Sequence, residues 1–154
     1  MDMREFLRPE AIRVVSSLSS KKRLFQHLAE IAAETRGLDE SEVVSALQDR
    51  EGLGPTALGG GVALPHARLS RLDSVAGAFI RLEEPIDFGA ADRQRVDIAF
   101  ALLAPEETGL AHLRTLASVA RVLRQGDVCH KLRSNDDPVT LHAILTEGRA
   151  THAA

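Results

Sequence analysis

Apolar residues recur at intervals of three and four positions along much of the chain, and this spacing predicts amphipathic helices. The first predicted helix starts after Ser20, a good N-cap residue, and ends at Arg36, where Gly37 can close its C-terminus. The second starts at Asp39, and Glu42 stands three residues later as a capping-box partner. The predicted helices cover about 21–36, 39–50, 110–125, 127–133 and 138–146.

Shorter apolar runs between the helices predict strands. The nearly continuous run 96–103 indicates a strand that is buried on both faces. The run 74–82 predicts another strand, which we expect Glu83-Glu84-Pro85 to end. Short strands are also expected at 12–15 and 62–64. Because helices and strands alternate along the chain, the sequence predicts an α/β fold.

The length of 154 residues fits a single domain over 1–154, with a core from about 7 to 146 and a loose tail over 147–154. The single cysteine, Cys129, fits a reducing compartment, and the N-terminus lacks a signal-peptide pattern, so we expect a cytoplasmic protein. The longest apolar run, 98–104, is far shorter than the roughly 20 residues that cross a bilayer. No membrane insertion is therefore expected.

The charge pattern argues against a nucleic-acid ligand. The formal net charge is −3, and the chain has no Trp or Tyr on which bases could stack. The two helices before residue 50 could form a helix-turn-helix. However, the second carries Glu40, Glu42 and Asp49, which DNA phosphates would repel.

The stretch 57–68 has the most distinctive local pattern. Three glycines, Gly59 to Gly61, permit a tight turn, and the short apolar run 62–64 follows them. Pro65 lacks an N–H group and ends the run, so His66 should be presented at a strand end at a defined angle. The pattern alone is also compatible with an ordinary turn beside an incidental histidine.

Residues before and after this stretch join it in a larger pattern. Arg50-Glu51, Gly54-Pro55-Thr56, the segment 58–66 and the segment 111–116 resemble the enzyme IIA domain of the fructose/mannitol class, in the bacterial phosphoenolpyruvate-dependent phosphotransferase system. The resemblance extends from about 7 to about 146 and is greatest to the nitrogen-regulatory branch. It implies a small mixed β-sheet flanked by helices and a phosphorylated histidine. It implies no cofactor.

The resemblance places three residues around the phosphoryl group. A neutral imidazole nitrogen of His66 would attack phosphorus, Arg50 would stabilise phosphoryl charge, and His112 would donate a hydrogen bond. Without the resemblance, Arg50 would more often be a solvated helix end and His112 a structural histidine. The supporting residues are Thr56, as a hydroxyl contact, and Gly61 and Pro65, which shape the turn.

Three functional hypotheses follow. In the first, His66 accepts phosphate from a histidine-phosphorylated carrier protein and passes it to an IIB-type acceptor or a regulatory target. In the second, the protein is a regulator that binds transporters or sensor kinases without phosphoryl transfer. In the third, His66 and His112 act as general base and acid of a hydrolase. A zinc site on the two histidines would need a third ligand, which the spacing does not suggest.

Two finer expectations accompany the first hypothesis. The chain carries no membrane segment and no appended carrier or IIB-like domain, which favours nitrogen-type regulation over sugar transport. The surface around His66 is expected to be apolar, because transfer between two histidines requires that water be excluded. We expect this surface to be formed by Val62, Ala63, Leu64 and Ala67.

Overall fold

The computed structural model describes residues 2–107 and 109–153, with side chains as far as Glu147. Two short 3-10 helices, η1 (Met3–Glu5) and η2 (Pro9–Ala11), precede the first strand. The strands are β1 (Ile12–Val15), β2 (Ala57–Gly59), β3 (Val62–Ala63), β4 (His66–Leu69), β5 (Ala76–Ile86) and β6 (Val96–Pro105). The α-helices are α1 (Lys21–Arg36), α2 (Glu40–Glu51), α3 (Gly109–Leu123), α4 (Gly126–Arg133) and α5 (Pro138–Ala153).

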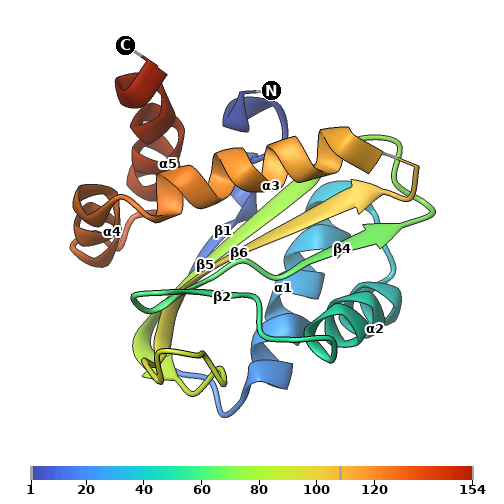
Figure 1. Ribbon diagram of the computed structural model, residues 1–154, viewed down its shortest axis with the longest axis horizontal. Coiled ribbons are helices and arrows are strands. Elements are labelled where there is room, and N and C mark those ends of the chain that lie inside the picture. Colours follow the sequence, from blue (N-terminus) through green and yellow to red (C-terminus); the bar gives the residue numbers. More distant parts are fainter. Residues whose placement is uncertain (1, 108, 154) are drawn as a thin grey trace.

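The described strands form one mixed sheet in the order β1-β5-β6-β3-β2, and β4 also pairs with β6. The pairs β1–β5, β3–β6 and β4–β6 are parallel, whereas β5–β6 and β2–β3 are antiparallel. In Figure 1 the sheet lies between α1 on one side and α3 on the other. This confirms the predicted α/β class, the mixed sheet flanked by helices and the single domain.

The core lies on both faces of the two central strands, as the apolar run in β6 predicted. From Val96 to Ala104 every residue of β6 except Asp97 is buried. Phe100 meets Phe6 and Phe79 edge to face, with ring centroids 6.4 Å apart in each pair. Such aromatic pairs stabilise the fold by about 0.5–1.5 kcal/mol each beyond their burial.

A break in one strand positions the candidate histidine. Ala63 pairs with Ala99 and His66 pairs with Leu102, so β3 and β4 keep the same register along β6. The carbonyl oxygen of Pro65 still accepts a hydrogen bond from Leu102 N–H at 2.9 Å. Because Pro65 has no N–H to give, the ladder is interrupted there, and His66 begins β4 rather than ending the preceding strand.

Other elements differ from the sequence prediction. The strands β2 and β4 were not predicted, because each is short and is bounded by glycine or proline. The strand β5 continues through Glu83-Glu84-Pro85 instead of ending there, because a register shift between Arg81 and Ile86 accommodates the proline.

The predicted helix ends are mostly confirmed. Ser20 caps α1 by accepting from Arg23 N–H, and Gly37 adopts a left-handed conformation at its other end. Asp39 caps α2 by accepting from Ser41 N–H. The capping box with Glu42 is not formed: the Glu42 carboxylate pairs with Arg71 at 3.5 Å.

The backbone of α5 continues through residues 147–153, where a loose tail was expected. The two alanines of this segment, Ala150 and Ala153, favour helix, and its one glycine, Gly148, costs only about 1 kcal/mol there. Ala154 lies outside the described residues.

Candidate functional site

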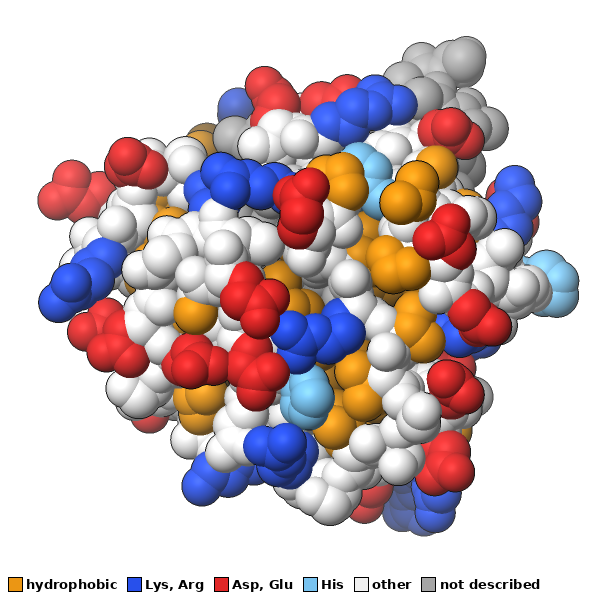
Figure 2. Space-filling model, turned by 180° about the vertical axis from the view of Figure 1, so that it is seen from behind, with side chains coloured by type: hydrophobic (Ala, Val, Ile, Leu, Met, Phe, Trp, Pro, Cys, Tyr) orange, Lys and Arg blue, Asp and Glu red, His pale blue; other side chains and the backbone are white. Residues whose placement is uncertain are grey.

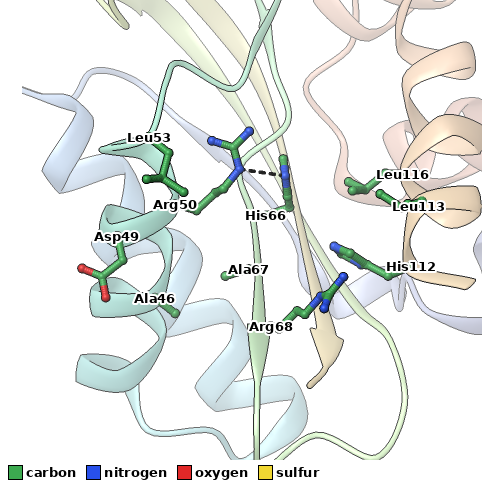
Figure 3. A pocket seen from close by; sticks show the side chains of 10 residues that line it. All are labelled: Ala46, Asp49, Arg50, Leu53, His66, Ala67, Arg68, His112, Leu113 and Leu116. Carbon is green, nitrogen blue, oxygen red and sulfur yellow. Dashed lines mark hydrogen bonds between the residues drawn. The ribbon is translucent and has the colours of Figure 1, made fainter. Parts of the chain in front are cut away.

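The three residues proposed to carry the chemistry lie together where β4 passes between α2 and α3 (Figure 3). Arg50 comes from the last turn of α2, His66 is the first residue of β4, and His112 comes from the first turn of α3. Since β4 pairs only with β6 among the described strands, its other edge is open to side chains from both helices.

The hydrogen bonds of His66 assign its tautomer. Its Nδ1 lies 2.9 Å from the carbonyl oxygen of Leu64, which can only accept, so Nδ1 carries the hydrogen. Nε2 then has a free lone pair, and Arg50 Nε–H donates to it at 3.2 Å. The ring thus presents an unprotonated Nε2 beside a permanent cation.

Arg50 is held in place by a second bond. Its Nη1 donates to the carbonyl oxygen of Gly54 at 3.1 Å. A guanidinium carries five N–H donors in a planar fork, so this leaves donors for an anion placed between Arg50 and His66.

His112 packs beside His66, with the ring centroids 6.0 Å apart and the ring planes inclined by 54°. It is only 4% exposed, and its Nδ1 has no hydrogen-bond partner within the described part of the chain. Leaving a buried polar atom unpaired costs about 1–3 kcal/mol. An atom that is nevertheless left unpaired is typical of a group that binds a ligand.

The surroundings keep both imidazoles neutral. Burial is the main cause that lowers the pKa of His66. The hydrogen bond to the Leu64 carbonyl opposes this and raises the pKa. The cation of Arg50 lowers it again, and Glu51 raises it by the smallest amount. Burial also lowers the pKa of His112, with contributions from His66 and Arg68. Both rings are therefore available as neutral bases at pH 7.

These residues line a cleft of about 470 Å³. Arg68 also lines it, and Figure 3 shows its guanidinium beside His112. Sequence analysis missed Arg68, although the alternation along β4 could have found it: His66 and Arg68 face the cleft, whereas Ala67 and Leu69 are buried.

The supporting residues act through the backbone and through neighbours. Thr56 is buried and gives its hydroxyl hydrogen to Glu51 at 2.6 Å, so it supports the site from behind. Gly61 has φ +81°, and a Cβ there would lie 2.8 Å from Arg133 Nη2. Pro65 makes the strand break that aims His66.

The apolar surface around the histidine comes from other residues than expected. Val62, Ala63, Leu64 and Ala67 are all buried and form no outer surface. The exposed apolar side chains at the cleft come from the loop after α2 and from α3. They are Leu53 (84% exposed) and Leu113 (57% exposed), with half-buried Leu116 beside them.

The described residues form neither a membrane-spanning helix nor a metal cluster. Within residues 2–107 and 109–153, no helix is long and apolar enough to span a bilayer. Among the described side chains, no group of three or more His, Cys, Asp or Glu is arranged to hold a metal ion.

Comparison with known proteins identifies the family to which the chain is similar. The model of the family described as "Phosphoenolpyruvate-dependent sugar phosphotransferase system, EIIA 2" matches residues 5–148. A nitrogen regulatory protein of Bradyrhizobium diazoefficiens is 44% identical over 153 residues, covering 99% of this chain and 100% of that protein.

Solved structures show the same fold. The nitrogen regulatory protein IIA-Ntr of Neisseria meningitidis is similar with a TM-score of 0.87 and 36% identity, covering 94% of this chain and 99% of that chain. The Escherichia coli mannitol enzyme IIA, solved in complex with phosphorylated mannitol enzyme IIB, has a TM-score of 0.76 and 21% identity, over 92% of this chain and 99% of that chain. At that identity the second likeness concerns the fold alone.

Proposed function

Because the chain belongs to the EIIA 2 family of the phosphoenolpyruvate-dependent sugar phosphotransferase system, we propose that His66 is the residue that carries its phosphoryl group. The protein is an EIIA-type phosphocarrier component of this system. The observation that supports the assignment to His66 is its unprotonated Nε2, which lies in the cleft and accepts a hydrogen bond from Arg50.

The transfer step uses the Nε2 lone pair. It attacks the phosphorus of a phosphohistidine on the donor, a P–N bond forms to Nε2, and the donor's P–N bond breaks with its electron pair returning to the donor imidazole. The positive charge that develops on the His66 ring is stabilised by the Nδ1–H bond to Leu64. Onward transfer is the reverse of this step, with an acceptor group attacking phosphorus.

Arg50 and His112 stabilise the moving phosphoryl group. Arg50 Nε–H leaves Nε2 and donates to a phosphoryl oxygen, which gains a charge-assisted hydrogen bond. His112 donates a second hydrogen bond from the opposite wall. Phosphoryl transfer depends on such positioning and charge stabilisation more than on covalent help from the protein.

The donor is a histidine-phosphorylated carrier protein, and the acceptor is an IIB-type protein or a regulatory target. The mannitol enzyme IIA is known in complex with phosphorylated enzyme IIB. Nitrogen-type regulation is favoured over sugar transport, because the relative with 44% identity over nearly the whole chain is a nitrogen regulatory protein.

Incubation of the purified protein with phosphoenolpyruvate, enzyme I and the carrier tests the proposal. The intact mass should rise by one phosphoryl group, and the bond should be labile in acid and stable in base. His66→Ala should show no rise. Labelling that persists in His66→Ala would move the site elsewhere. A parent protein that binds its target but is never labelled would favour the binding-only alternative.

A further inference from the structure

Glu51, the last residue of α2, is a buried carboxylate that contacts neither histidine. Its side chain is 7% exposed. Oε1 accepts the hydroxyl hydrogen of Thr56 at 2.6 Å, and Oε2 accepts from Thr56 N–H at 3.0 Å. Lys21 also donates to Oε2 at 3.1 Å, and its ammonium lies 4.2 Å from the centre of the Phe88 ring. Three directed donors hold this carboxylate in one position.

A first chain of hydrogen bonds runs from Glu51 to Nδ1 of the candidate histidine. Thr56, fixed at its N–H and hydroxyl, accepts Leu64 N–H on its carbonyl oxygen at 3.0 Å. The carbonyl oxygen of Leu64 accepts His66 Nδ1–H at 2.9 Å. The position of Thr56 thus sets the orientation of the acceptor that determines the His66 tautomer.

A second chain reaches Nε2 of the same ring. Glu51 and Thr56 are joined directly, so the loop 52–55 between them is closed across its ends. Within that loop Gly54 has φ +151°, and its carbonyl oxygen accepts from Arg50 Nη1 at 3.1 Å. Arg50 Nε–H then donates to His66 Nε2 at 3.2 Å. The closed loop therefore sets where the guanidinium points.

We propose that Glu51, held by Lys21, is the positioning residue of the site, because through Thr56 it fixes the partners of both ring nitrogens of His66. This inference rests on the proposed phosphoryl transfer by His66. Glu51 does not touch the phosphoryl group; it keeps the imidazole and the guanidinium in the arrangement from which transfer occurs.

A purely structural role for the buried carboxylate makes a different prediction. Removing one partner of a buried ion pair destabilises a fold. If Glu51 is purely structural, its removal would lower the melting temperature and leave the two hydrogen bonds of the His66 ring unchanged in the folded protein. If Glu51 is a positioning residue, its removal also changes the two hydrogen bonds of the His66 ring in the folded protein. The removal then lowers the transfer rate at saturating carrier without changing the carrier concentration that gives half the maximal rate.

Glu51→Gln and Thr56→Val test the two partners of the Glu51–Thr56 hydrogen bonds. The first removes the charge that Lys21 pairs with, and the second removes the hydroxyl donor while keeping the side-chain shape. Thr56→Ser keeps the hydroxyl and serves as the conservative rescue. Glu42→Gln is the matched control, because it removes one carboxylate from the same helix, where the side chain is exposed and pairs with Arg71.

Nitrogen-15 NMR of the unphosphorylated variants reports the positioning directly. In Glu51→Gln and Thr56→Val, the Arg50 Nε–H and His66 Nδ1–H signals should exchange faster with water than in the parent. The single-turnover rate at saturating phosphorylated carrier should fall between about tenfold and about a hundredfold, as expected for a misplaced reacting group. Thr56→Ser and Glu42→Gln should match the parent in both measurements.

The inference is overturned if folded Glu51→Gln keeps parent-like signals for both groups, or if Thr56→Ser is impaired as much as Thr56→Val. If Glu51→Gln does not fold, the comparison of Thr56→Val with Thr56→Ser decides alone. A parent protein that is never phosphorylated would refute the proposed function. In that case the NMR signals of the same variants still show whether Glu51 positions the ring.

Discussion

At the scale of single residues, the chemistry depends on which nitrogen of His66 carries the proton. The Leu64 carbonyl holds the hydrogen on Nδ1, and so the lone pair is on Nε2, next to Arg50. Burial and this cation both disfavour a second proton on the ring. The same environment that holds the ring therefore also keeps it nucleophilic.

The pH dependence of phosphoryl acceptance should reflect this environment. Since the pKa of His66 is lowered from its ordinary value of 6.5, the ring stays neutral to a lower pH. The single-turnover rate should reach half its maximum at a pH below 6.5 and should level off as the pH rises further. Arg50→Gln removes the cation and should raise the pKa of His66, which an NMR titration of the ring measures.

The stability of the phosphorylated carrier at each pH, measured without the protein, is the control for this profile. A half-maximal rate above pH 6.5 in the parent would contradict the assigned environment of His66.

Sequence motifs indicated the candidate reactive residues more readily than the residues that orient them. His66, Arg50 and His112 were proposed because the motif carries their identities, and the fold brings all three to one cleft. The hydrogen bonds of Glu51 to Thr56 and Lys21 were missed, because a sequence does not distinguish a buried carboxylate from an exposed one at a helix end. Arg68 was missed because β4 itself was not predicted.

At the scale of elements, the turn from β2 into β3 fixes the start of β3, the strand that leads to Pro65 and His66. Gly59, Gly60 and Gly61 all have positive φ angles of +93°, +65° and +81°. The carbonyl oxygen of Gly61 accepts from Asp97 N–H at 3.0 Å and from Ile98 N–H at 3.2 Å, and Arg133 donates to the Gly60 carbonyl oxygen at 2.7 Å. The turn is thereby attached to β6 and to α4.

Gly61→Ala should be the most damaging of the single alanine substitutions in this turn. A Cβ there would combine an unfavourable backbone conformation with approaches of 2.8 Å to Arg133 Nη2 and 3.2 Å to Arg95 O. We expect a loss on the order of 2–3 kcal/mol in the free energy of unfolding, measured by urea denaturation. Gly60→Ala, with positive φ but open space, should lose only about 1 kcal/mol.

Gly126→Ala is the control for these variants, because Gly126 begins α4 at an ordinary φ with nothing within 4 Å. It should be neutral or stabilising by up to about 1 kcal/mol. Equal stability of Gly61→Ala and Gly126→Ala would contradict the tight turn.

The sequence predicted the helices α1, α2 and α4 and the strands β1 and β6 closely, because an apolar repeat or run marks each of them. The strands β2 and β4 were missed because each is short and adjoins glycine or proline, and they depend on pairing with β3 and β6 for their existence. The extent of β5 depends on a register shift that only the partner strand reveals.

At the scale of the whole molecule, the candidate cleft has exposed apolar side chains on both of its sides. Leu53 lies on the α2 side and Leu113 on the α3 side, with His66 between them (Figure 3). On the face shown in Figure 2, acidic and basic side chains surround the hydrophobic ones. An apolar rim around the half-buried His66 suits a partner that must exclude water during transfer.

Leu53→Glu and Leu113→Glu should therefore weaken productive contact with the phosphorylated carrier. Each side chain is exposed, so the melting temperature and the pKa of His66 should stay close to the parent values. A charge on the rim must be desolvated when the partner docks, and the loss of one apolar anchor commonly costs about 1.4 kcal/mol, or about a tenfold rise in the carrier concentration that gives half the maximal rate.

Val139→Glu is the matched control, because Val139 is 68% exposed on α5 and lines neither side of the cleft. Titration of the transfer rate against carrier concentration measures all three variants. If Leu53→Glu and Leu113→Glu both keep the parent value, or if Val139→Glu raises it equally, the carrier docks on another surface.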